Sequence, residues 1–213
     1  EKYIKFAQTN KIDCICEKPF LLGKNKMEMI IKNFKKNKTK FLLSIPWIFN
    51  NNIQRIAKKN KYEFNEIKID WHEKDNIIKY GLKKTFDKNI NFYQDVISHI
   101  ICLLYKFFKG KKIKINFKSS SLFYFKKKKI ILSLKKNSKK NMRKISFYKN
   151  NQNVSSIFLG KDIRYFINKK NYFYKDKKRD LDKMILYFIK NDYMKIFKDY
   201  SNLFVIISKL TRG

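Results

Sequence analysis

The stretch Ile15-Cys16-Glu17-Lys18-Pro19-Phe20 decides how the fold is interpreted. A largely apolar run at residues 12–15 leads directly into it. Isoleucine and cysteine suit a buried strand, and a proline cannot donate a hydrogen bond inside a sheet, so the strand is expected to end at Pro19. The pattern therefore predicts a strand that delivers Lys18 to the edge of a sheet. From these residues alone, an ordinary strand end with a turn after it is the plainer interpretation.

Periodicity along the rest of the chain predicts alternating helices and strands. We expect helices at residues 1–10, 24–37, 47–59, 92–108, 181–190 and 200–210. We expect strands at residues 12–16, 41–45, 62–71, 113–117, 122–125, 130–134, 145–148, 154–159 and 163–167. Residues 72–91 lack a clear period and are predicted to form a loop. The later strands are separated by short polar clusters, which is typical of an antiparallel meander.

The tripeptide Glu17-Lys18-Pro19 and the elements predicted after it resemble a known family of enzymes. A helix, a short strand and a longer strand come next, and then Asp95 and His99, four residues apart on a predicted helix. This order is similar to that of the Gfo/Idh/MocA family of NAD(P)-dependent oxidoreductases, which has a Glu-Lys-Pro signature and an Asp-x-x-x-His pair. The similarity is clearest at residues 12–110 and thin at residues 111–178.

The resemblance implies an α/β fold in two parts. Residues 1–45 would be the tail of a Rossmann-type, doubly wound NAD(P)-binding domain. Residues 46–213 would form an α+β substrate-binding and oligomerisation domain, with a mostly antiparallel sheet covered by helices. The sequence has 5 glycines and no Gly-x-Gly-x-x-Gly turn. We therefore expect the phosphate-binding turn for NAD or NADP to lie upstream, and the chain to be a fragment.

Histidine is the natural proton acceptor for alcohol oxidation because its usual pKa lies nearest neutrality. The chain has 2 histidines. His72 lies in a charged segment without an evident partner and is predicted to be a surface or loop residue. His99 has Asp95 one helical turn before it, and from spacing alone a catalytic pair and an ordinary helix-face pair are equally open.

The resemblance assigns roles to these residues. It implies that His99 is the acid/base, that Asp95 positions the substrate, and that Lys18 reaches both the substrate hydroxyl and the cofactor ribose. Glu17 and Pro19 would complete the cofactor-binding turn, with Glu17 supporting its shape. The implied reaction is hydride transfer between a nicotinamide and a hydroxyl carbon of a sugar or sugar derivative, including nucleotide-linked sugars. A family member without catalysis is a further alternative.

The net charge of +35 offers a rival interpretation, an RNA- or polyanion-binding protein. The excess is almost all lysine, however, whereas arginine is the usual residue for bidentate contacts to phosphates and bases. Lysine, asparagine, isoleucine, phenylalanine and tyrosine share AT-rich codons, so a biased genome explains the composition. We therefore interpret most of the charge as a solvated surface and do not favour nucleic acid as the partner.

The remaining composition bounds the class of protein. Hydrophobic residues make up 44% of the chain, enough for a packed core, and no apolar run approaches the roughly 20 residues that span a bilayer. The three cysteines give no disulfide framework and no metal site, which suggests a reducing cytoplasm. The resemblance also implies a homo-oligomer, a dimer or tetramer, because the family's open sheet face commonly makes subunit contacts.

Overall fold

The computed structural model describes residues 1–18, 20, 23–59, 64–74, 78–79, 82–83, 92–108, 115–119, 122–125, 128–160, 163–167, 170–175 and 179–211. Its contacts divide the chain into two compact units. Unit 1 contains Glu1–Asn51, Tyr93–Gly110 and Lys178–Gly213, and unit 2 contains Asn52–Phe92 and Lys111–Lys177. The predicted domain boundary at residue 45 stays a prediction, and each unit is described by itself.

Unit 1 begins with two short parallel strands joined by a helix. Strand β1 (Cys14–Cys16) pairs with β2 (Phe41–Leu43), with Cys14 opposite Phe41. Helix α1 (Lys2–Thr9) precedes β1, and α2 (Gly23–Lys36) connects the two strands. A tight turn reverses the direction of the chain and can join only antiparallel strands. Parallel strands such as β1 and β2 need a longer connection, which α2 provides here. The order of helices and strands predicted for this region is confirmed.

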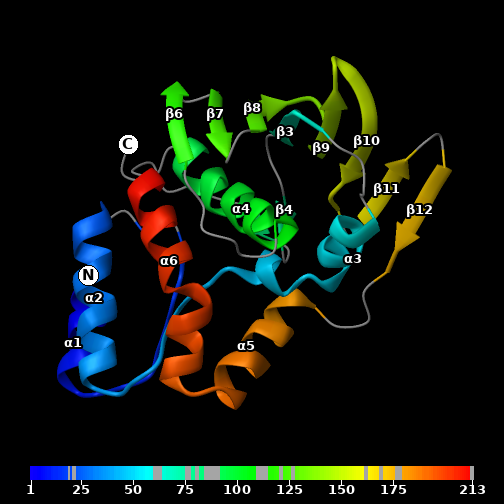
Figure 1. Ribbon diagram of the computed structural model, residues 1–213. Coiled ribbons are helices and arrows are strands. Elements are labelled where there is room, and N and C mark those ends of the chain that lie inside the picture. Colours follow the sequence, from blue (N-terminus) through cyan, green and yellow to red (C-terminus); the bar gives the residue numbers. More distant parts are fainter. Residues whose placement is uncertain are drawn as a thin grey trace. The chain divides into compact units, whose positions relative to one another are not determined.

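Three further helices complete unit 1. They are α4 (Phe92–Phe107), α5 (Asp180–Lys190) and α6 (Tyr193–Thr211). Figure 1 shows α2 and α6 side by side, and α6 also contacts β2. Phe41 joins these elements, since its ring centroid lies 5.0 Å from that of Phe34 on α2 and 6.0 Å from that of Phe204 on α6. None of the helices that the structure describes is long and apolar enough to cross a membrane.

The helix predicted at residues 47–59 is two elements. A short 3₁₀ helix, η1 (Pro46–Phe49), precedes α3 (Asn51–Lys59). Asn50 between them has an extended backbone, with φ −74° and ψ 106°. Its side-chain amide donates a hydrogen bond of 2.8 Å to Oδ2 of Asp180, at the start of α5. The interruption of the helix at Asn50 therefore lets its side chain link this segment to the start of α5, 130 residues later.

Helix α2 offers a matched test of the core of unit 1. Met27 is fully buried, whereas Met29, two residues later, is 55% exposed. Replacing Met27 by alanine is expected to lower the free energy of unfolding by about 2–5 kcal/mol, because it removes buried contacts and leaves a cavity. Met29→Ala should change it by less than about 0.5 kcal/mol. Urea denaturation measures both, and equal costs would contradict the arrangement of α2.

Tyr187 on α5 makes unit 1 sensitive to alkaline pH. Its Oη donates a hydrogen bond of 2.7 Å to Oδ2 of Asp199 on α6. Burial, and then this hydrogen bond, raise the pKa of Tyr187. The folded protein therefore keeps a proton that the unfolded tyrosine releases near its ordinary pKa of about 10. This contribution is complete below about pH 10 and is lost as the pH rises further.

We expect the urea midpoint to fall above about pH 10, and to fall less steeply in Tyr187→Phe. Tyr3 supplies the control, because its side chain is 84% exposed. Tyr3→Phe should behave like the unmodified protein over the whole pH series. An equally steep fall in Tyr187→Phe would show that the Tyr187–Asp199 contact is not responsible.

Unit 2 is built on a mostly antiparallel sheet. Among the described residues its strand order is β12-β11-β10-β9-β3-β8-β7-β6. The strands are β3 (Glu66–Lys74), β6 (Ile115–Ser119), β7 (Leu122–Phe125), β8 (Lys128–Ser138), β9 (Met142–Lys149), β10 (Gln152–Phe158), β11 (Ile163–Ile167) and β12 (Lys170–Tyr174). Only the β3–β8 pair is parallel in this described sheet. The predicted α/β fold with a mostly antiparallel sheet is confirmed.

The predicted meander is interrupted at its centre. Strand β3 lies between β8 and β9, so the chain forms two antiparallel runs, β6 to β8 and β9 to β12 (Figure 1). Strand β12 was not predicted. The predicted loop at residues 72–91 is wrong at its start, because β3 continues to Lys74 and a small hairpin comes after it, β4 (Ile78–Lys79) with β5 (Leu82–Lys83). Residues 84–91 lie outside the described residues.

Alternation along β3 sets the two faces of this sheet. Ile67, Ile69 and Trp71 are at most 1% exposed and share one face, as a strand's period of two requires. Their partners on β9 are Phe147, Ile145 and Arg143. The opposite face carries Glu66, Lys68, Asp70 and His72, all partly exposed.

Candidate active site

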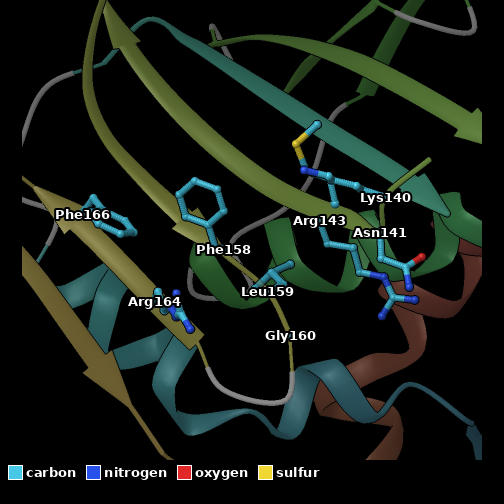
Figure 2. Close-up of a pocket in the computed structure, with 9 residues that line it drawn as sticks. Lys140, Asn141, Arg143, Phe158, Leu159, Gly160, Arg164 and Phe166 are labelled. Atoms are coloured by element: carbon cyan, nitrogen blue, oxygen red, sulfur yellow. The ribbon is translucent and has the colours of Figure 1, made fainter. Parts of the chain in front are cut away.

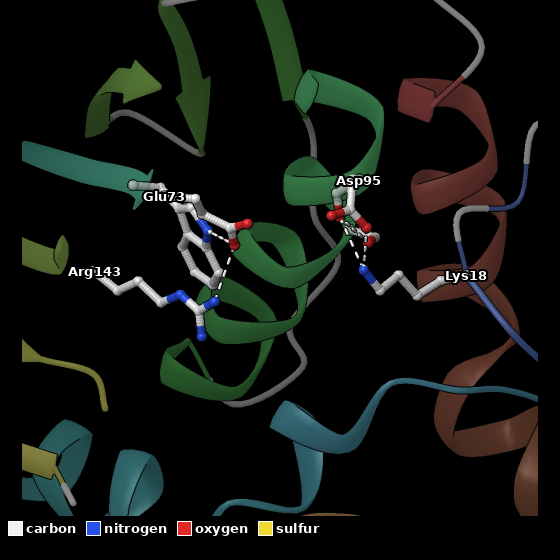
Figure 3. Close-up of polar contacts among 6 residues, drawn as sticks. Lys18, Glu73, Asp95 and Arg143 are labelled. Carbon is white, nitrogen blue, oxygen red and sulfur yellow. Dashed lines mark hydrogen bonds and ion pairs between the residues drawn. The ribbon is translucent and has the colours of Figure 1, made fainter. Parts of the chain in front are cut away.

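Lys18 stands just beyond the carboxyl end of β1, where the sequence predicted it. Its side chain is 16% exposed and extends toward α4 (Figure 3). There its Nζ forms an ion pair with Oδ1 of Asp95 and donates a second hydrogen bond of 3.3 Å to the Asp95 carbonyl oxygen. The two residues are 77 positions apart in sequence. The fold of unit 1 thus brings together two of the predicted site residues.

Asp95 lies in the first turn of α4. A carboxylate is favoured there because the unpaired N–H groups give this end of a helix a partial positive charge. Ser98, which is 1% exposed, donates from its Oγ to the Asp95 carbonyl oxygen at 3.2 Å. The carboxylate and the backbone carbonyl oxygen of Asp95 therefore both accept hydrogen bonds. The Lys18 ammonium donates to each of these two groups.

His99 lies one turn after Asp95 on α4. From Val96 to Leu104 all residues except His99 are buried, and His99 is partly buried. His99 is thus partly exposed on the face of α4 that carries Asp95.

The backbone of Phe20, two residues after Lys18, is anchored by the last helix, α6. Phe20 is 3% exposed, and its carbonyl oxygen accepts a hydrogen bond of 2.6 Å from Oγ1 of Thr211, a fully buried residue on α6. Sequence reasoning missed Thr211, because nothing local marks it. Glu17 is exposed at the strand end, and Pro19 lies outside the described residues. Their predicted roles in cofactor binding stay predictions.

The cysteines of unit 1 do not add a nucleophile or a metal site. Burial raises the pKa of the Cys102 thiol, and the positive charge of Lys18 opposes this rise, which places Cys102 within electrostatic reach of the site. Burial, with Cys14 as a second cause, raises the pKa of Cys16 to about 11. Thiols of this kind are neutral near pH 7 and poor nucleophiles. The described residues contain no cluster of three or more side chains able to hold a metal ion.

His72 is not the unpartnered loop residue that the sequence suggested. It lies on β3 of unit 2, partly buried, with its Nε2 3.1 Å from Oγ of Ser133 on β8.

Near the end of β3, Glu73 makes two side-chain contacts that sequence reasoning missed. Glu73 is buried and accepts hydrogen bonds from Trp71 Nε1 at 3.2 Å and from Arg143 Nη2 at 3.0 Å (Figure 3).

Comparison with known proteins gives a likeness of fold. No protein-family profile and no curated protein sequence matches this chain. Among solved structures, KijD10, a 3-ketoreductase from Actinomadura kijaniata in complex with NADP and TDP-benzene, matches with a TM-score of 0.73 and 7% identity, over 99% of this chain and 72% of that one. The chain has the fold of the Gfo/Idh/MocA-type dehydrogenases.

Two further structures of this fold agree. UDP-N-acetylglucosamine 3-dehydrogenase GnnA from Acidithiobacillus ferrooxidans matches with a TM-score of 0.69 and 10% identity, over 99% of this chain and 73% of that one. A dehydrogenase (MviM) from Clostridium difficile matches with a TM-score of 0.64 and 11% identity, over 96% and 73%. The fold implied by Glu17-Lys18-Pro19 is thereby confirmed, while the roles of Lys18, Asp95 and His99 stay predictions.

Proposed function

We propose that the chain is part of an NAD(P)-dependent oxidoreductase that acts on a hydroxyl carbon of a sugar, with nucleotide-linked sugars as the favoured substrates. The observation that carries this proposal is the ion pair between Lys18 and Asp95. It joins two residues that only the family resemblance had linked, and His99 lies one turn away. The substrate class is supported by the fold shared with GnnA, a UDP-N-acetylglucosamine 3-dehydrogenase, and with KijD10, a 3-ketoreductase solved with TDP-benzene.

The residues present fit one end of a dinucleotide. In open sheets with parallel strands, ligands bind outside the carboxyl ends of the strands, which is where Lys18 lies beyond β1. KijD10 was solved in complex with NADP. When bound, the nicotinamide would accept or deliver the hydride. Lys18 would contact the ribose and Glu17 would support the turn, whereas these 213 residues contain no glycine-rich turn for the diphosphate.

Unit 1 also exposes apolar side chains on α1 and β1, where a further β-strand could pair with β1. Tyr3 and Phe6 on α1 are 84% and 59% exposed, and Ile15 on β1 is 38% exposed. Among the described residues β1 pairs with β2 alone. An unpaired strand edge beside exposed aromatic rings commonly marks a surface that another segment covers. We therefore propose that a further strand covers this edge of β1.

The three side chains would each take a separate part of the chemistry. A lysine ammonium has three N–H donors, and two of those of Lys18 go to Asp95, which leaves one for a substrate hydroxyl. Its positive charge would stabilise the oxygen as negative charge develops there. His99 would take the hydroxyl proton during oxidation or return it during reduction. Asp95 would fix Lys18 and orient the substrate beside His99.

The homo-oligomer implied by the resemblance belongs to the same proposal, and size-exclusion chromatography with light scattering measures the oligomeric state directly.

The reaction itself is tested with the protein that the complete gene encodes. NAD and NADP are each offered with a panel of nucleotide-linked and free sugars, and the reduced nicotinamide is monitored by its absorbance. We expect turnover with at least one nucleotide-linked sugar. Binding of a dinucleotide without turnover on any sugar would favour a non-catalytic member of the fold and contradict the proposal.

A further inference from the structure

A second candidate binding site lies in unit 2, apart from the residues already assigned. A cavity of about 630 Å³ opens where β9 begins and β10 ends. Lys140 and Asn141 border it on one side, and Phe158, Arg164 and Phe166 on the other (Figure 2). Pockets of about 300–1,000 Å³ hold small molecules of nucleotide size. The cavity is therefore large enough for an organic ligand.

Strand register explains why cations and rings meet here. Lys144 on β9 pairs with Phe158 on β10, which pairs with Arg164 on β11, which pairs with Phe173 on β12. The Lys144 ammonium lies 5.3 Å from the Phe158 ring centroid, and the Arg164 guanidinium lies 6.0 Å from that of Phe173. Directly opposed side chains on one face of a sheet interact in this way. The row presents alternating positive and aromatic groups.

Two aromatic rings line the cavity side by side. The rings of Phe158 and Phe166 meet edge to face, with centroids 5.4 Å apart and planes at 79°. Met142 also lines the cavity. Methionine and phenylalanine side chains offer a polarizable surface that a flat ring can stack upon. The side of the cavity lined by Phe158 and Phe166 thus suits an aromatic or heterocyclic group.

The charge of the cavity suits a dianion. Arg143 is already paired with the buried carboxylate of Glu73, so its charge is balanced. Lys140 and Arg164, both exposed, contribute two further positive charges, and none of the described lining residues is acidic. A phosphate monoester carries a charge of about −1.5 to −2 at pH 7. The positive charges of Lys140 and Arg164 suit an anion such as a phosphate group.

The presence of arginine here is not explained by composition. The sequence has 52 lysines and arginines, of which only Arg55, Arg143, Arg164, Arg179 and Arg212 are arginines. Two of these five line the same cavity. Arginine, unlike lysine, presents a planar fork that matches phosphate oxygens. Arg143 already contacts Glu73 and lies 4.7 Å from the Trp71 ring centroid, so Arg164 is the arginine that we assign to a phosphate.

We propose that this cavity binds a small organic phosphate that carries a flat ring, such as a nucleoside monophosphate. The phosphate is bound by Arg164 and Lys140, and the ring lies against Phe158 and Phe166. This site is independent of the proposed redox reaction, because it uses none of the residues of unit 1. It could therefore bind its ligand in a protein that has no turnover.

Calorimetry with the full chain tests the site, at about 0.15 M ionic strength so that diffuse surface attraction is screened. The probes are AMP, adenosine and inorganic phosphate. We expect AMP to bind with one site per chain, and adenosine and phosphate to bind at least tenfold more weakly. Arg164→Gln should weaken AMP at least tenfold. Because Arg164 is exposed, this variant should fold, and its melting temperature is measured beside the unmodified protein.

Arg179→Gln is the matched control, since Arg179 is an arginine of unit 1 with a side chain 78% exposed. It should leave AMP binding unchanged. Three results would each overturn the proposal. AMP affinity unaffected by Arg164→Gln would place AMP elsewhere, an equal loss in Arg179→Gln would indicate diffuse polyanion attraction, and no saturable AMP binding at millimolar concentration would remove the site.

Discussion

Replacing His99 by glutamine is expected to lower kcat by about 100- to 10,000-fold, which is the usual contribution of a positioned general acid or base. Glutamine keeps much of the size and polarity of the imidazole but cannot take a proton near neutral pH. The partly exposed position of His99 on an otherwise buried stretch of α4 means that the substitution should not disturb the core. Dinucleotide affinity, measured by fluorescence titration, should change less than about threefold, well under 1 kcal/mol.

The second histidine provides the control for this prediction. His72 lies on β3 with its Nε2 near the Ser133 hydroxyl, and it has no proposed part in the reaction. His72→Gln should retain the kcat of the unmodified protein. If His99→Gln also retained it, His99 would not be the acid/base. Loss of turnover in both variants to the same degree would point to a general effect of histidine replacement on folding.

Replacing Lys18 by methionine is expected to abolish turnover and to destabilise the fold. The substitution leaves the Asp95 carboxylate, whose side chain is 21% exposed, without its ammonium partner. Loss of a partner from a charged hydrogen bond in such a position costs about 1.5–3 kcal/mol. We therefore expect the free energy of unfolding to fall by about 2 kcal/mol. Urea denaturation and steady-state turnover are measured on the same preparation.

A double variant separates stability from chemistry. Lys18→Met with Asp95→Leu replaces both partners by apolar groups, which can be nearly neutral for stability. We expect it to regain most of the lost stability but none of the turnover, because Lys18 and Asp95 would both act on substrate. Lys26→Met is the control, since Lys26 pairs with Glu1 at an exposed position, with side chains 49% and 60% exposed. It should cost less than about 1 kcal/mol.

Recovery of turnover in the double variant would show that the Lys18–Asp95 pair is a structural contact only. Full stability in Lys18→Met alone would contradict the ion pair itself. Turnover therefore tests the proposed chemistry, and the free energy of unfolding tests the Lys18–Asp95 ion pair, so either can be contradicted without the other.

Much of the fold could be predicted because its signals are local. Helix α4 has a broad apolar surface over sixteen residues, and α2 shows a clear three-and-four spacing, so both were found within one or two residues. The position of β3 could not be predicted. It pairs with β8 and β9, about 60 to 80 residues later, and periodicity carries no information about which strands become neighbours. The meander was therefore expected to be continuous.

The candidate site was predictable only in part, for the same reason. Lys18 was singled out by the strand end and proline after it, and Asp95 and His99 by their spacing and by the family resemblance. The contact between Lys18 and Asp95 required the fold. Thr211 and the Glu73–Arg143 pair were missed because they act across 191 and 70 residues of sequence, with no local motif.

The most direct test of the proposed function traces the hydrogen that is transferred. A nucleotide-linked sugar deuterated at the carbon that bears the reacting hydroxyl is incubated with the complete protein and NAD or NADP, and the reduced cofactor is analysed by mass spectrometry. We predict one deuterium on the nicotinamide ring for each sugar oxidised, and a rate at least 100-fold lower in His99→Gln, in line with the loss of an acid/base group. Reduced cofactor that contains no deuterium, or label transfer at an undiminished rate in His99→Gln, would contradict the proposed chemistry.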